Sequence, residues 1–168
     1  MIIKKFDTLF LDRDGVINFK LEGKYIQDVS EFKFIPGVLL AMNKLSTVFK
    51  RIIIVTNQQG IGKRIMSDLE LKKVHDFMLA RINAEGGRIE KIYYCPHLVK
   101  DDCNCRKPNP GMIQQAFYDY PKIDAKHSYL IGDSESDIQA GKQCNLHTVK
   151  VDKKYTLLEW SIELLSFI

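Results

Sequence analysis

Phe10-Leu11-Asp12-Arg13-Asp14-Gly15-Val16-Ile17-Asn18 is the most informative segment of this 168-residue chain. The apolar run that leads into it, Thr8 to Leu11, is typical of a buried parallel strand. Gly15 then lets the chain leave that strand abruptly. Asp12 and Asp14 are therefore predicted to lie at the carboxyl end of a strand, where open α/β sheets bind their ligands. Side chains two residues apart in an extended segment point the same way, so both carboxylates can face one crevice.

These carboxylates form either a functional site or a simple turn with solvated acids. Two anions this close are unfavourable unless a cation lies between them or one of them takes a proton. A lone Asp-x-Asp-Gly is more often a turn with solvated acids, but three further stretches favour a site. Each is a strand end or loop with polar side chains, and all are expected to converge on one edge of a sheet: Ile52 to Val55 followed by Thr56, Asn57 and Gln58; Arg106, Lys107 and Pro108; and Tyr129 to Gly132 followed by Asp133, with Asp137 four residues later.

Strand and helix patterns alternate along the chain, which predicts an α/β fold with a doubly wound parallel sheet and helices on both faces. Residues 18–34 are predicted to form a small β-hairpin flap beside the site, and residues 57–63 a loop. His75 is expected to be a surface or packing residue. Strands are expected over residues 8–11, 51–55, 89–94, 128–131 and 146–151, and helix starts at Pro36-Gly37, at the capping box Ser67 to Glu70, at Pro110 and at Ser134.

The composition, with 45% hydrophobic and 27% charged residues, is that of a soluble globular protein. The length predicts a single domain, 1–168, with no insertion large enough for a lid domain. The N-terminus lacks a signal peptide's apolar region, and no apolar run approaches the ~20 residues that span a bilayer, so a cytoplasmic location without membrane contact is expected. The net charge of +4 suits an anionic small molecule and is too diffuse to indicate nucleic acid.

The C-terminal segment, residues 155–168, is apolar enough to form a helix on the sheet edge. Its Trp160 and Leu164 would serve equally well in a contact between two copies of the chain. The sequence therefore leaves a monomer and a homodimer open.

Four motifs stand in a fixed order along the chain: D-x-D-G-V from Asp12, T-N from Thr56, R-K-P from Arg106 and G-D-x-x-x-D from Gly132. Together they resemble the motifs of the haloacid dehalogenase (HAD) phosphatase superfamily, over residues 6–151. The chain is most similar to the branch that contains the D-glycero-D-manno-heptose-1,7-bisphosphate phosphatases and the histidinol-phosphate phosphatases. This resemblance implies a Rossmann-like fold and a Mg²⁺-dependent phosphomonoester hydrolase.

The resemblance implies that Asp12 is the nucleophile and forms an aspartyl-phosphate. Asp14 would protonate the leaving oxygen and then activate water, and a second carboxylate nearby is expected to raise its pKa. Asp12, Asp14 and Asp133 would bind Mg²⁺, Asp14 also through its backbone carbonyl, and the ion would offset the repulsion between nucleophile and phosphoryl group. Asp137 is expected either to support these metal ligands or to cap its own helix.

Four more residues are implied to handle the substrate. Thr56 and Asn57 match the position at which the family binds the phosphoryl oxygens, through a hydroxyl and backbone N–H groups. Lys107 matches the lysine that pairs with both the nucleophile and the phosphoryl group. Arg106 is expected either to bind a second substrate anion with two hydrogen bonds or to form a surface ion pair.

Three of the four cysteines fall within eleven residues, alongside a histidine: Cys95, His97, Cys103 and Cys105. In a reducing compartment such clustering favours metal binding over disulfides. The resemblance adds that this branch carries a zinc loop here. Four protein ligands would make a closed, structural Zn²⁺ site, and that site would order the loop that carries Arg106 and Lys107. Cys144, which stands alone, is expected in the core.

Sequence features divide the branch. The Thr56 to Ile61 loop and the segment from Lys107 to Met112 resemble the heptose enzymes, whereas the short loop from Leu98 to Asp102 resembles the histidinol phosphatases. We expect hydrolysis of D-glycero-D-manno-heptose 1,7-bisphosphate at the 7-phosphate, with histidinol phosphate as the alternative. Nucleic-acid 3′-phosphatases share the T-N-Q loop but lack the zinc loop. A non-catalytic, zinc-stabilised binding module on a decayed phosphatase fold is a fourth possibility. Loss of activity normally removes the nucleophile or the general acid, but Asp12 and Asp14 are both present.

Overall fold

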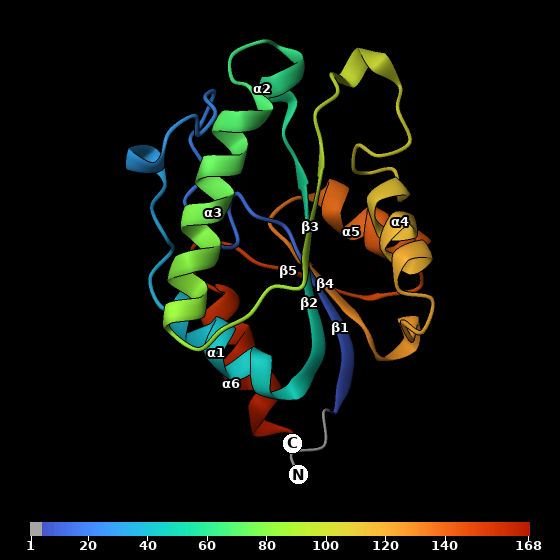
Figure 1. Ribbon diagram of the computed structural model, residues 1–168. Coiled ribbons are helices and arrows are strands. Elements are labelled where there is room, and N and C mark those ends of the chain that lie inside the picture. Colours follow the sequence, from blue (N-terminus) through green and yellow to red (C-terminus); the bar gives the residue numbers. More distant parts are fainter. Residues whose placement is uncertain (1–4) are drawn as a thin grey trace.

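The computed structural model describes residues 5–168, and its centre is a five-stranded parallel sheet (Figure 1). The strand order is β3-β2-β1-β4-β5. The chain moves outward from β1 to β2 and β3 and then returns to the other side of β1. The crevice at this reversal, between the carboxyl ends of β1 and β4, is where doubly wound sheets bind ligands. The strands are β1 (Phe6–Leu11), β2 (Phe49–Asn57), β3 (Lys91–Cys95), β4 (Tyr129–Gly132) and β5 (His147–Lys150).

Helices cover both faces of the sheet, which confirms the predicted fold class. Figure 1 shows α1 (Val38–Val48), α3 (Asp68–Ala84) and α6 (Leu157–Ser166) on one side, and α4 (Gly111–Asp119) and α5 (Glu135–Gln143) on the other. Alternation along β1 serves two cores, because Leu9 and Leu11 join the first and Phe10 the second. Ser67 and Glu70 form the predicted capping box of α3.

The smaller elements are α2 (Gln59–Gly62) and three 3-10 helices: η1 (Val29–Glu31), η2 (Val99–Asp101) and η3 (Ala125–His127). The helix α2 lies within the predicted loop 57–63, so that part of the prediction was wrong. Across residues 5–168, none of the helices combines the length and the apolar character that crossing a membrane requires.

The segment of residues 18–34 does not form the predicted β-hairpin. Asn18 makes only isolated bridges, to Asp14 and to Phe34, and η1 follows a capping box at Asp28. Ile26 and Phe32 are buried in the first core. These side chains anchor the segment to the core, so it needs no strand ladder to lie beside the site.

The C-terminal helix α6 lies against α1 on a face of the sheet, where the sequence predicted a place at its edge. Trp160 is 5% exposed, and its ring centroid lies 5.7 Å from that of Tyr129 and 6.3 Å from that of Phe49. Leu164 packs against the same core. Trp160 is therefore a core residue and has no surface to offer a second copy of the chain.

Candidate active site

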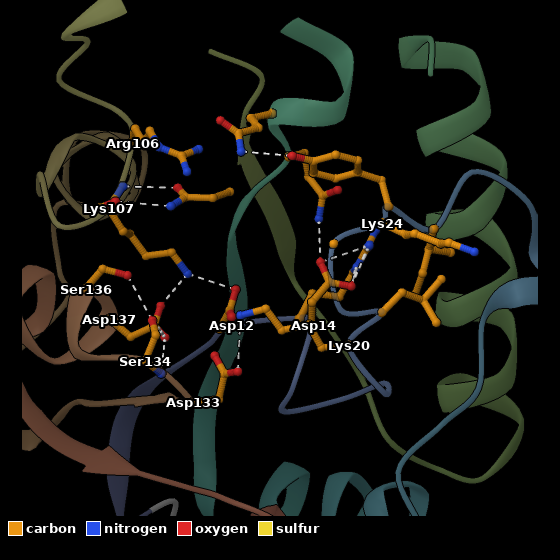
Figure 2. A pocket seen from close by; sticks show the side chains of 18 of the residues that line it. Asp12, Asp14, Lys20, Lys24, Arg106, Lys107, Asp133, Ser134, Ser136 and Asp137 are labelled. Atoms are coloured by element: carbon orange, nitrogen blue, oxygen red, sulfur yellow. Dashed lines mark hydrogen bonds and ion pairs between the residues drawn. The ribbon is translucent and has the colours of Figure 1, made fainter. Parts of the chain in front are cut away.

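The carboxyl ends of the central strands open into a pocket of about 370 Å³ (Figure 2). Most of the site residues predicted from the sequence line it: Asp12, Asp14, Asn57, Arg106, Lys107, Asp133 and Asp137. Thr56 does not line the pocket. It is fully buried, and its hydroxyl accepts a hydrogen bond from Gln58 Nε2 at 2.8 Å. Further cationic side chains line the pocket and would attract an anion: Arg13, Lys20, Lys24 and Lys63.

Lys107 is a buried cation of this pocket, with an exposed fraction of 4%. Its Nζ lies 2.8 Å from Asp12 Oδ1 and 2.6 Å from Asp137 Oδ1, and it donates a hydrogen bond to the Val55 carbonyl. Burial alone would lower the pKa of Lys107, but the two carboxylates outweigh burial and raise it. The lysine therefore stays charged.

Asp137 caps its own helix, one of the two roles expected from the sequence, and also faces the pocket. Its Oδ2 accepts hydrogen bonds from Ser134 N at 3.0 Å and Ser134 Oγ at 2.6 Å, and so caps α5. Its Oδ1 faces Lys107 in the pocket. The carboxylate thus ties the start of α5 to the charged centre of the site.

Asp12, Asp133 and Asp137 form a group whose carboxylate oxygens lie within 4.8 Å of one another. Asp133 Oδ1 is buried without a hydrogen-bond partner. Burial, with smaller contributions from Asp137 and Asp14, raises the pKa of Asp12 to about 7 against the opposing charge of Lys107. Burial also raises the pKa of Asp133. Lys107 pairs with Asp12 and Asp137, and Asp133 has only the exposed Lys20, 3.4 Å from its Oδ2. Three carboxylates around one buried lysine leave negative charge in the interior, so this set of hard oxygen atoms fits a Mg²⁺ ion.

Gly15 allows the loop after β1 to approach Asp133. Its φ is +92°, and a Cβ at this position would lie 2.3 Å from Asp133 Oδ2. Any larger residue would clash with that carboxylate and would be strained at this φ. The glycine of the first motif is therefore required by the geometry of the site as well as by the turn.

The Asp14 carboxylate lies outside this group and is surrounded by donors. It accepts hydrogen bonds from Arg13 Nη2 at 2.8 Å, Asn18 Nδ2 at 2.9 Å and Gln58 Nε2 at 2.9 Å. Burial alone would raise the pKa of Asp14, but Arg13 and these hydrogen bonds outweigh it and hold the pKa below its ordinary value. The raised pKa predicted from the neighbouring carboxylate was wrong, because Arg13 and not Asp12 dominates the surroundings.

Asn57 and Arg106 differ in how they use their side chains. The Asn57 amide donates to the Lys107 carbonyl at 3.1 Å and accepts from the Lys107 N–H at 3.0 Å, so it holds the loop that carries the lysine. Arg106 points into the pocket (Figure 2), where its Nη1 is buried without a hydrogen-bond partner. Arg106 forms no ion pair with any residue of the described range 5–168, which contradicts the surface ion pair.

Cys95, His97, Cys103 and Cys105 come together after β3, with ligand atoms within 4.8 Å of one another. Cys103 Sγ lies 3.5 Å from the Sγ atoms of both Cys95 and Cys105, and His97 Nδ1 lies 3.6 Å from Cys95 Sγ. Cys105 Sγ lies 2.7 Å from Cys95 Sγ and 3.1 Å from His97 Nδ1, whereas zinc bonds of ~2.3 Å in a tetrahedron place sulfurs about 3.8 Å apart, so an ion would move Cys105 outward. Three thiols and an imidazole are a donor set whose chemistry fits Zn²⁺. The cysteines of the described chain are free thiols, and Cys144 is buried as expected.

Sequence reasoning gave Arg13 and Gln58 no role and expected His75 to be a surface or packing residue. Arg13 and Gln58 bind the Asp14 carboxylate, and His75, 7% exposed, accepts a hydrogen bond from Arg13. A signal for Arg13 was present, because a cation between two carboxylates in one motif suggests a local ion pair. Nothing in the sequence links His75 to residues 62 positions away.

Comparison with known proteins gives matches along most of the chain. The HAD-hydrolase-like family model matches residues 104–157. A D-glycero-alpha-D-manno-heptose-1,7-bisphosphate 7-phosphatase from Mycobacterium bovis is 37% identical over 131 residues, which cover 78% of this chain and 69% of the relative. The corresponding D-glycero-beta enzyme from Escherichia coli is 35% identical over 152 residues, which cover 86% of this chain and 78% of the relative.

A solved structure matches the fold and the length. The D,D-heptose 1.7-bisphosphate phosphatase from B. bronchiseptica, complexed with magnesium and phosphate, superimposes with a TM-score of 0.88 at 28% identity and covers 96% of this chain and 99% of its own. The expected superfamily is thereby confirmed, and the motifs that suggested it lie around one pocket. This chain is a phosphatase of the HAD superfamily and belongs to the heptose-1,7-bisphosphate 7-phosphatase family.

Proposed function

We propose that this phosphatase removes the 7-phosphate of D-glycero-D-manno-heptose 1,7-bisphosphate. The relatives described above are named for that substrate, some for its alpha and some for its beta anomer, and the proposal covers both. The observation in the structure that supports it is Arg106, whose buried, unpartnered guanidinium nitrogen lies in the pocket next to Lys107. A bisphosphate would place its reacting phosphate beside Asp12 and Lys107 and its second phosphate on Arg106.

The alternatives fit the pocket less well. Histidinol phosphate has a single phosphate and a cationic amine, which Arg106, Lys24 and Lys63 would repel. For a nucleic-acid 3′-phosphatase we would expect cations and aromatic rings along an extended groove, whereas the cations here line a compact pocket. The non-catalytic module is set aside because the chain is a phosphatase with both Asp12 and Asp14 in place.

In the proposed reaction the Asp12 carboxylate attacks phosphorus while the bond from phosphorus to the leaving oxygen breaks. Lys107 orients Asp12 and offsets its charge. Asp14 donates a proton to the leaving oxygen. It then takes a proton from the water that attacks the aspartyl-phosphate, and the bond to Asp12 breaks. The lowered pKa of Asp14 favours the ionised carboxylate that the second step needs. The negative charge of a bound phosphate would raise this pKa and so favour the protonated form that the first step needs.

Two metals are part of the proposal. Asp12, Asp133 and Asp137, with the Asp14 carbonyl, would hold Mg²⁺, which when bound offsets the charge of the phosphoryl group and its nucleophile. The B. bronchiseptica relative holds magnesium and phosphate. Cys95, His97, Cys103 and Cys105 would hold a structural Zn²⁺, because four protein ligands leave no open position. Cytoplasmic residence stays a proposal that follows from free thiols around such a site.

The proposed function is tested by turnover of heptose 1,7-bisphosphate and histidinol phosphate in the presence of Mg²⁺. We expect kcat/KM to favour the bisphosphate by about 100-fold, which corresponds to one charged contact of ~3 kcal/mol. Asp12→Asn should abolish turnover of both while the circular dichroism spectrum is unchanged. Preference for histidinol phosphate would refute the substrate assignment, and substantial residual activity of Asp12→Asn would refute the nucleophile.

Arg106→Ala should reduce the use of a bisphosphate selectively. A two-pronged charged contact is worth roughly 1.5–3 kcal/mol, so KM for the bisphosphate should rise by about one to two orders of magnitude. Turnover of a small aryl phosphate, which has no second anion, should change far less. The matched control is Lys100→Ala, an exposed cation of the same loop that does not line the pocket. Equal loss on both substrates would mean that Arg106 serves the reacting phosphate or the loop itself.

Asp133→Asn should show that the carboxylate group destabilises the metal-free protein and is needed to bind Mg²⁺. After exchange into Mg²⁺-free buffer at pH 8, above the pKa of about 7 of Asp12, the variant should melt at a higher temperature than the parent because one repulsive charge is gone. Mg²⁺ at 100 times its Kd should add about 2.7 kcal/mol of stability to the parent and little to the variant. Glu135→Gln removes an exposed carboxylate nearby and should keep the Mg²⁺ response. An unchanged response in Asp133→Asn would place the ion elsewhere.

Protein purified without added zinc should contain about one Zn²⁺ per chain, as a closed four-ligand site retains its ion. Cys103→Ser with Cys105→Ser should remove the ion and lower the melting temperature, because metal binding to such a site is coupled to folding of its loop. Cys144→Ser, at a buried thiol outside the cluster, should keep the full zinc content. Metal analysis by mass spectrometry decides the matter, and unchanged zinc in the double variant would rule the site out.

A further inference from the structure

Arg13 and His75 form a buried pair behind Asp14 that the chemistry described so far does not use. Arg13 is 1% exposed and His75 is 7% exposed. Arg13 Nη2 lies 2.8 Å from Asp14 Oδ1 and 3.0 Å from Asp14 Oδ2, and Arg13 Nη1 lies 3.1 Å from His75 Nε2. Carboxylate, guanidinium and imidazole thus form one chain of contacts from the pocket to helix α3.

The direction of these hydrogen bonds is set by chemistry. A guanidinium can only donate, so His75 Nε2 accepts and the ring carries its proton on Nδ1. Burial, followed by the charge of Arg13, lowers the pKa of His75 to about 3, which keeps the ring neutral. An apolar residue in its place would leave an N–H of a buried cation unpaired, and a second cation would repel Arg13.

We infer that His75 is a positioning residue of the reaction, because it fixes the Arg13 guanidinium that orients the Asp14 carboxylate. The inference rests on the proposed function, in which Asp14 is the acid and then the base. Arg13 has a long side chain, and beyond Asp14 itself its far end contacts the His75 nitrogen and the Phe32 ring, whose centroid lies 5.9 Å from Arg13 Cζ. Removal of the imidazole frees one nitrogen of the guanidinium, so the guanidinium and the Asp14 carboxylate that it binds can move.

The test compares leaving groups. Heptose 1,7-bisphosphate releases a sugar hydroxyl that needs the proton of Asp14, whereas 2,4-dinitrophenyl phosphate releases a phenolate that leaves without one. In single-turnover experiments with excess enzyme and Mg²⁺, His75→Ala should lose about tenfold to 100-fold on the bisphosphate, the range expected for a misplaced catalytic group. Its rate on the dinitrophenyl ester should stay within about twofold, because the position of Asp14 does not matter in that step. Asp14→Asn should show the same selectivity more strongly.

Two further variants separate positioning from packing. His75→Gln offers an amide oxygen that can accept from Arg13, and it should restore most of the rate on the bisphosphate. Met78→Ala removes a fully buried side chain from the same helix, so it should lower the melting temperature without any difference between the two substrates.

The outcomes are distinct. Selective loss in His75→Ala with rescue by His75→Gln supports the inference. Equal loss on both substrates, no loss on either, or the same selectivity in Met78→Ala would overturn it while the proposed function stands. If the parent enzyme does not hydrolyse the bisphosphate, or if Asp14→Asn shows no selectivity, the proposed roles fail and this inference fails with them.

Discussion

The active site depends on one buried ammonium, that of Lys107, and on the two carboxylates that face it at 2.8 Å and 2.6 Å. A lysine buried without partners would lose its charge or destabilise the fold by several kcal/mol. Its partners come from two places, since Asp12 follows β1 and Asp137 lies in the first turn of α5, after β4. Only the parallel pairing of β1 with β4 brings them together, so the charge balance of the site depends on the strand order of the sheet.

Lys107 comes from a loop, and that loop is held from two sides. On one side the Asn57 side chain binds both backbone groups of Lys107. On the other, Cys103 and Cys105 stand immediately before Arg106 and Lys107 in a cluster with Cys95 at the end of β3. A disturbance of the Cys/His cluster would therefore displace Lys107 and Arg106, although neither belongs to the cluster.

A feature of this structure could be predicted from the sequence where local patterns decide it, and could not where contacts between distant residues decide it. The buried runs before Asp12, Thr56 and Asp133 predicted strands, and the carboxyl ends of parallel strands must meet, so the convergence of the site was predictable. The irregular segment 18–34 was not, because its packing is decided by Ile26 and Phe32 in the core and not by a local period. His75 contacts Arg13 from 62 positions away, and Asn57 forms a hydrogen bond with Lys107 from 50 positions away. No local pattern encodes such contacts.

Asp12 and Asp14 share one motif but lie in opposite electrostatic surroundings. Burial raises the pKa of Asp12, whereas Arg13, Asn18 and Gln58 outweigh burial at Asp14 and lower it. The surroundings thus raise the pKa of Asp12 and lower that of Asp14, opposite to the shifts that the proposed roles of nucleophile and acid call for. A divalent cation beside Asp12 would stabilise its anion, and a phosphate beside Asp14 would favour its proton. In the proposed mechanism, a bound metal and a bound phosphate would therefore shift the two pKa values in the directions that the first step needs.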